Sequence, residues 1–148
     1  MCESTCRKMT SSAITLGEAA SPAKPRAIIA GHGSFADGLV SAVELISGRG
    51  GVFLAISNSG LSGPDIEAHF RTVAADASIR VFFTDLPGGS ATLAVRKLMR
   101  LDPEIVLVTA ANLATLLEFV FQADADPRDA AKRSADKGRA ALAAYGGA

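Results

Sequence analysis

The sequence predicts an α/β fold in which a doubly wound, mainly parallel sheet of four strands, or slightly more, carries helices on both faces. Three observations predict it. Short β-branched and aromatic runs alternate with longer helical patterns, each run is almost continuously apolar, and the connections are short. Continuously apolar strands are typical of parallel sheets covered on both faces. Short crossovers between parallel strands are right-handed and give the doubly wound arrangement.

Four apolar runs are the predicted strands, at residues 27–30, 51–56, 79–83 and 104–108. Helical periodicity predicts helices at about residues 35–47, 64–77, 90–101, 112–122 and 128–144. Ser34 and Ser90 stand where N-caps are expected. Pro64 suits a first helical position, and Gly48 can end the first helix.

Length and composition fit one compact domain, since 49% of the 148 residues are apolar and 20% are charged. Residues 1–25 are rich in Ser, Thr, Ala and Pro without an apolar period, so we expect a disordered tail followed by one domain over residues 26–148. No apolar run reaches the roughly 18 residues of a membrane-spanning helix, and the N-terminus lacks the apolar core of a secretory signal. A cytoplasmic protein without direct membrane insertion is therefore expected.

Charge and cysteine content argue against several classes of function. Basic and acidic residues number 15 each, Trp is absent and aromatic residues are 5%, so nucleic acid is not an expected partner. Cys2 and Cys6 lie in the N-terminal tail with no His nearby, so no local four-ligand metal site can form. We expect neither a metal nor a cofactor.

In doubly wound sheets, functional groups gather beyond the carboxyl ends of the strands, where the strand order reverses. This rule selects four loops, at residues 31–34, 57–60, 84–90 and 110–112. In the first loop His32 stands between Gly31 and Gly33, so that another protein can approach the imidazole closely. Imidazole is a competent nucleophile at neutral pH. Taken alone, His32 is explained equally well by a hydrogen bond across the strand end.

The third loop supplies groups that complement a histidine. Asp85 follows a neighbouring parallel strand and can accept a hydrogen bond from one imidazole nitrogen, which leaves the other nitrogen free to attack. Gly88, Gly89 and Ser90 present N–H groups and one hydroxyl at a helix N-terminus, an arrangement that suits phosphate oxygens. Taken alone, this segment is better explained by a turn followed by an N-cap.

Three segments together carry a resemblance to a known family, namely IIAGHGSFADGL at residues 28–39, FTDLPGGS at residues 83–90 and ANLATLLE at residues 111–118. They resemble the enzyme IIA proteins of the mannose/fructose/sorbose class of the bacterial phosphotransferase system. The resemblance extends from about Arg26 to the C-terminus, with the segments in order and at the expected intervals. Two departures concern the surface that faces the IIB component: Ala91, Thr92 and Leu93 replace the usual run with Pro and Asn, and Ala114 replaces a usual Pro.

The resemblance implies a histidine phosphocarrier of a sugar phosphotransferase system. His32 would accept a phosphoryl group from the carrier HPr and pass it to a IIB component. Asp85 would be the hydrogen-bond partner of the histidine, and Ser90 with the amides of Gly33, Gly88 and Gly89 would contact the phosphoryl oxygens. A homodimer is also implied, and the resemblance allows association with the membrane-bound IIC and IID components.

Three other interpretations are considered at this point. The same histidine would serve a regulatory module whose phosphorylation reports on metabolism without feeding a transporter. A nucleotide-binding enzyme is less well supported, because Gly38 is misplaced for a dinucleotide loop and no acidic residue ends the second strand. A metal-dependent hydrolase would need a further ligand, and His69 is expected on the surface of a helix.

Overall fold

The computed structural model describes residues 23–147, so most of the predicted tail, residues 1–25, lies outside the described residues. Its centre is a sheet of four parallel strands in the order β2-β1-β3-β4. The strands are β1 (Ala27–Gly31), β2 (Phe53–Ser57), β3 (Val81–Thr84) and β4 (Val106–Val108). The predicted doubly wound α/β fold is therefore confirmed.

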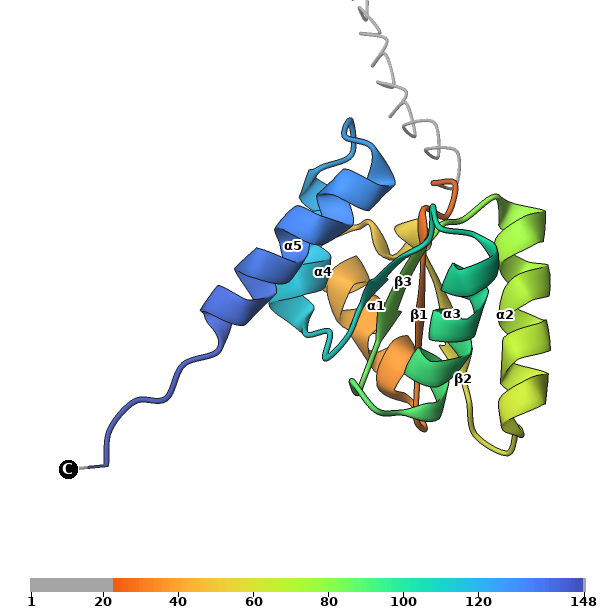
Figure 1. The fold of residues 1–148 in the computed structure, drawn as a ribbon. Helices are drawn as coiled ribbons and strands as arrows, with labels where there is room; N and C mark the ends of the chain where they lie inside the picture. The colour runs from red at the N-terminus through yellow and green to blue at the C-terminus, as the bar shows by residue number, and fades with distance from the viewer. Residues whose placement is uncertain (1–22, 148) are drawn as a thin grey trace, which may run out of the picture.

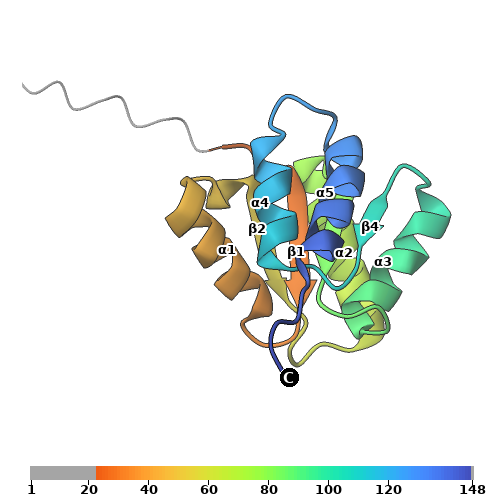
Figure 2. The same cartoon turned by 90° about the vertical axis from the view of Figure 1, so that its left-hand side faces the viewer.

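Helices cover both faces of this sheet, as Figures 1 and 2 show. The helices are α1 (Phe35–Ser47), α2 (Gly63–Ala77), α3 (Ser90–Leu101), α4 (Leu113–Phe121) and α5 (Pro127–Ala141), with a short 3-10 helix, η1, at Gly50–Val52. One apolar core joins α1, α4 and α5 to the sheet, and the other joins α2 and α3 to the opposite face. No helix within residues 23–147 is long and apolar enough to cross a membrane.

Alternate residues of each strand serve the two cores. Ile29 and Phe83 pack in the first core, whereas Ile28 and Phe82 pack in the second. All four side chains are fully buried. This explains the almost continuous apolarity of the strands, because a parallel sheet between two helical layers has no solvent face.

The element boundaries differ from the predicted ones by up to three residues. The strands predicted at 79–83 and 104–108 begin two residues later, because Ile79 and Ile105 are buried but lie before the ladder. The second strand begins at Phe53 because η1 occupies the residues before it. The apolar character of the sequence therefore did not locate the first residue of these strands that pairs with a neighbouring strand.

Two of the four predicted helix signals, Ser34 and Gly48, occupy the expected places. Gly48 ends α1 in the left-handed region with φ of 66°. Pro64 lies one place later than predicted, because α2 begins at Gly63 and Pro64 is its second residue. Ser34 is the N-cap residue of α1, although its side chain makes no capping bond. The prediction for Ser90 is wrong: Gly89 is the N-cap residue of α3, and Ser90 is the first helical residue. This shift leaves the Ser90 hydroxyl available for a contact outside its own helix.

The last two helices pack very closely at Gly138. The carboxamide of Asn112 caps α4 by accepting a hydrogen bond from the Thr115 N–H at 2.9 Å, and it donates to the Gly138 carbonyl at 3.0 Å. A Cβ atom at Gly138 would overlap the Thr115 hydroxyl and lie 3.0 Å from Thr115 Cβ. Only glycine therefore fits at this crossing without displacing α5.

We expect Gly138→Ala to destabilise the fold by about 1–3 kcal/mol, because the added methyl group must push α5 away from α4. The matched control is Gly38→Ala in α1, where a Cβ atom meets nothing within 4 Å. That variant should gain about 0.5–1 kcal/mol from the better helix propensity of Ala. Urea unfolding of both variants measures the difference, and two changes of the same sign would contradict the packing analysis.

Candidate functional site

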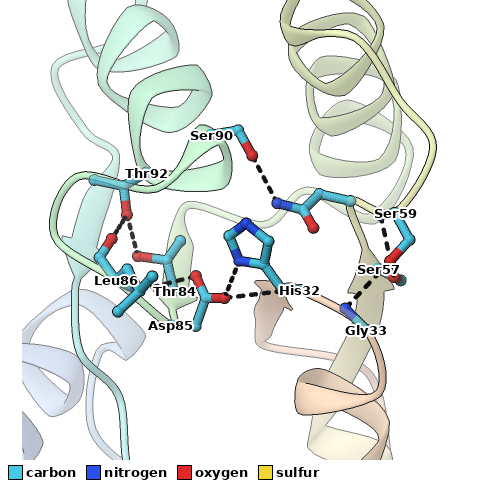
Figure 3. Close-up of polar contacts among 10 residues, drawn as sticks. His32, Gly33, Ser57, Ser59, Thr84, Asp85, Leu86, Ser90 and Thr92 are labelled. Atoms are coloured by element: carbon cyan, nitrogen blue, oxygen red, sulfur yellow. Dashed lines mark hydrogen bonds and ion pairs between the residues drawn. The ribbon is translucent and has the colours of Figure 1, made fainter.

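The strand order places the candidate site where the winding of the sheet reverses. β1 lies between β2 and β3, and the chain leaves it toward α1 on one face, whereas α2 and α3 cover the other face. The loops after β1, β2 and β3 therefore meet at one edge of the sheet, as parallel strand ends do. Figure 3 shows the polar side chains of these loops facing one another.

His32 and Asp85 form a hydrogen-bonded pair at this edge. The Nδ1 atom of the imidazole lies 2.6 Å from Oδ2 of Asp85, and the backbone N–H of His32 donates to the same oxygen at 2.8 Å. A carboxylate can only accept, so Nδ1 carries the proton and Nε2 holds the free lone pair. In Figure 3 the second ring nitrogen points away from Asp85, toward the side on which Ser90 lies. The free lone pair is therefore directed out of the pair.

The two partners differ in exposure. The side chain of His32 is 60% exposed, whereas that of Asp85 is 9% exposed. Burial raises the pKa of Asp85, but hydrogen bonds from the ring and backbone N–H of His32, and from Leu86 N–H, lower it by more, so that it lies below the ordinary value of 3.8. The carboxylate is therefore ionised throughout the neutral range and holds the ring in one tautomer.

Gly31 allows this close arrangement, and Gly89 lies next to it. A Cβ atom at Gly31 would lie 2.8 Å from Cγ of Asp85 and 2.7 Å from the Phe35 ring. Real Cβ atoms do not approach neighbours so closely, so the carboxylate could not reach His32 past any larger residue. A Cβ atom at Gly89 would lie 3.6 Å from Cε1 of His32, an ordinary contact. The start of α3 therefore lies beside the imidazole.

Two buried threonines, Thr84 and Thr92, hold the loop that carries Asp85 in place. Thr92 donates its hydroxyl hydrogen to the Leu86 carbonyl, and its oxygen lies 2.6 Å from the Thr84 hydroxyl. Since Thr92 has only one hydrogen to give, Thr84 is the donor in the second bond. These bonds fasten the loop to β3 on one side and α3 on the other.

The loop after β2 supplies contacts that the sequence analysis did not assign. The Asn58 carboxamide donates from Nδ2 to Ser90 Oγ at 2.7 Å. Ser59 Oγ accepts from the Gly33 N–H at 3.2 Å, so this amide is already engaged. Residues 57–60 were among the four predicted loops, and their polar character was the only available signal.

The remaining predicted residues have clear positions. Gly88 is exposed in the turn before α3, and the Gly89 N–H donates to the Leu86 carbonyl at 3.2 Å. His69 is exposed on α2, as expected. Within residues 23–147 no three His, Cys, Asp or Glu side chains gather in a way that could hold a metal ion. The chemistry available at this edge is that of an oriented imidazole beside hydrogen-bond donors.

Comparison with solved structures identifies similar folds. The phosphotransferase system component EIIA from Streptococcus agalactiae is 28% identical, with a TM-score of 0.66 over 76% of this chain and 93% of that one. The mannose/sorbose-specific IIA subunit from Enterococcus faecalis is 19% identical, with a TM-score of 0.71 over 84% and 96%. A IIA protein associated with the fucose utilization operon of Streptococcus pneumoniae is 20% identical, with a TM-score of 0.69 over 82% and 93%.

The resemblance to phosphotransferase-system IIA components is confirmed. No model of a protein family matches the chain, and no curated protein matches it in sequence. The solved structures that the chain resembles are components of the phosphotransferase system, and the likeness spans nearly their whole length.

The low pKa of Asp85 leads to a pH-dependent prediction for Asp85→Asn. Asparagine offers one acceptor oxygen in place of two. Its amino group would therefore face one of the N–H groups whose hydrogen bonds the carboxylate now accepts, and two donors would meet. The variant should be less stable than the parent at about pH 7. A group whose pKa is lowered by folding contributes stability above its unfolded value and loses it as pH falls through the folded value.

The difference in unfolding free energy should therefore shrink as the pH falls below 3.8, the ordinary Asp value. Urea unfolding at several pH values measures it. Asp136→Asn removes an exposed carboxylate from α5 and serves as the control, with an expected effect within about 0.5 kcal/mol. A difference for Asp85→Asn that stays constant down to low pH would contradict the assignment of the stabilisation to the ionised form.

Proposed function

We propose that the protein is a histidine phosphocarrier of a sugar phosphotransferase system, which accepts a phosphoryl group from HPr on His32 and passes it to a IIB component. The observation that supports this most directly is the 2.6 Å contact between Nδ1 of an exposed histidine and a largely buried carboxylate. Such a contact orients a nucleophile without consuming its reactive nitrogen. The IIA fold of the structural relatives supports the same proposal.

The proposed step needs little covalent machinery. The lone pair of Nε2 attacks the phosphorus of the phosphohistidine donor, a new N–P bond forms, and the donor nitrogen leaves with the electrons of the old bond. The Nδ1 proton stays in its hydrogen bond to Asp85, which stabilises the positive charge that develops on the ring. Because no proton must leave, the reverse transfer to a second protein uses the same geometry.

The start of α3 offers donors for the phosphoryl oxygens. The first-turn N–H groups of a helix have no partner within that helix, and the positive end of its dipole favours an anion. Ser90 adds a hydroxyl at the same place. Of the predicted donors, Gly33 and Gly89 are the least suitable, since their N–H groups already bind the Ser59 hydroxyl and the Leu86 carbonyl.

The surroundings of His32 favour a protein as the transfer partner. Leu61, Leu86 and Leu93 are exposed large apolar side chains on the loops and helix next to the site. Apolar side chains around a reactive group are typical of a surface that another protein covers. Together with the phosphotransferase system assignment, this supports a relay between proteins in the cytoplasm.

The decisive experiment incubates the protein with phosphoenolpyruvate, enzyme I and HPr. We expect one acid-labile, base-stable phosphate per chain, found on Nε2 by NMR of the labelled ring, because Nδ1 is occupied by Asp85. His32→Ala should abolish the label. His69→Ala, which changes an exposed histidine on α2, should leave it intact.

Label that persists in His32→Ala, or that is lost in His69→Ala, would overturn the proposal. Coupling to transport is tested separately, by fast exchange of the phosphate with a IIB component and by loss of sugar uptake without the protein. Unchanged uptake together with a phosphorylated His32 would favour the regulatory module over the transport component.

We also propose that the protein is a homodimer, as the family resemblance implies. β4 is an edge strand, and a groove of about 620 Å³ runs between it and α5. Leu142 and Tyr145, which follow α5, are exposed. Unpaired strand edges and exposed apolar side chains are commonly covered by another chain.

Sedimentation equilibrium at micromolar concentration should give twice the chain mass of 15.1 kDa. A mass equal to a single chain over the whole concentration range would exclude the dimer.

A further inference from the structure

Asn58 is a largely buried polar side chain at the edge of the sheet that carries His32. It follows β2 directly and is only 6% exposed. Its backbone N–H donates to the Gly31 carbonyl at 3.1 Å, and its carbonyl accepts from the Leu61 N–H at 3.3 Å. The pairing of β1 with β2 thus continues one residue past β2 and fixes Asn58 next to the His32 loop.

The carboxamide of Asn58 controls the direction of the Ser90 hydroxyl. Nδ2 of Asn58 donates to Ser90 Oγ at 2.7 Å, as the dashed line from Ser90 shows in Figure 3. A serine hydroxyl has one hydrogen to donate and two lone pairs that accept. One lone pair is therefore occupied, and the hydrogen must point away from Asn58, since two donors facing each other repel. The hydrogen is therefore free to point toward the side of the imidazole opposite Asp85, which is the side on which Ser90 lies in Figure 3.

We propose that Asn58 is a positioning residue that makes Ser90 a donor to the phosphoryl group in transfer. This inference rests on the proposed phosphocarrier function. A free serine hydroxyl at the start of a helix readily turns toward nearby backbone groups. A hydroxyl already directed at the developing charge stabilises the transition state without reorganising first. Asp85 and Asn58 thus act in parallel, the first on the ring and the second on the hydroxyl beside it.

A purely structural role for Asn58 would be to tie the β2 loop to α3 through the same bond. The variant Asn58→Asp separates the two roles. The carboxylate has the size of the carboxamide and keeps a bond to Ser90, but the direction is reversed because a carboxylate only accepts. The tie survives, whereas the Ser90 hydrogen is turned away from the phosphoryl group.

The experiment measures single-turnover transfer from phosphorylated HPr to the full chain. Asn58→Asp and Ser90→Ala should each slow the transfer roughly 10–100-fold at saturating donor, with an unchanged donor concentration for half-maximal rate. In the Ser90→Ala background, Asn58→Asp should cost less than about threefold, because the hydroxyl on which it acts is gone. That second comparison also measures the effect of the added charge alone. Ser62→Asp, which places the same charge at the N-cap of α2, should transfer at the parent rate.

The two proposals are overturned by different results. If the parent protein takes no phosphate, or His32→Ala takes as much, the phosphocarrier function itself fails. If the parent is phosphorylated and Asn58→Asp transfers at the parent rate, or loses the same factor in both backgrounds, only the role of Asn58 is overturned. Should Asn58→Asp not fold, as judged by circular dichroism, Asn58→Ala decides: a loss of roughly 10-fold supports the role and a parent rate overturns it.

Discussion

The site depends on the close approach of the Asp85 carboxylate to β1 at Gly31. The register of β1 with β3, which pairs Ala30 with Thr84, places the residues after these two strands side by side. The carboxylate then occupies the volume in which a Cβ atom of Gly31 would lie. From there it reaches the backbone and the ring of His32 together. The absence of a side chain at Gly31 thus creates the position from which the nucleophile is oriented.

This geometry orients an exposed histidine without burying it. Oδ2 of Asp85 accepts two hydrogen bonds from the same residue, one from its backbone and one from its ring, so the ring is fixed relative to its own chain. Oδ1 accepts from Leu86 N–H, which fixes the carboxylate in turn. Packing usually removes side-chain freedom, but here hydrogen bonds do so. The reactive nitrogen can therefore remain accessible to another protein.

The sequence predicted the fold and the pairing of His32 with Asp85, but not the whole site. Continuous apolar runs are sufficient to predict a parallel sheet, and strand-end loops rich in Gly, His and Asp predict where function lies. The first paired residue of β3 was misplaced because Ile79 is as buried as the strand that follows. Asn58 was missed because the partner of a carboxamide depends on which loops adjoin, and that follows from strand order. The sequence alone predicts the Ser90 hydroxyl as a cap, whereas in the structure it accepts from a neighbouring loop.

The departures from the usual IIA sequence pattern lie mainly below the surface. Ala91 and Thr92 are buried, and Thr92 uses its hydroxyl to hold the Leu86 carbonyl and thereby the loop of Asp85. Only Leu93 of this run is well exposed, at 52%. The hydroxyl of Thr92 therefore supports the loop that carries Asp85. The changes at Ala91 and Thr92 therefore concern how the loop is supported, and the change that a partner protein would meet directly is Leu93.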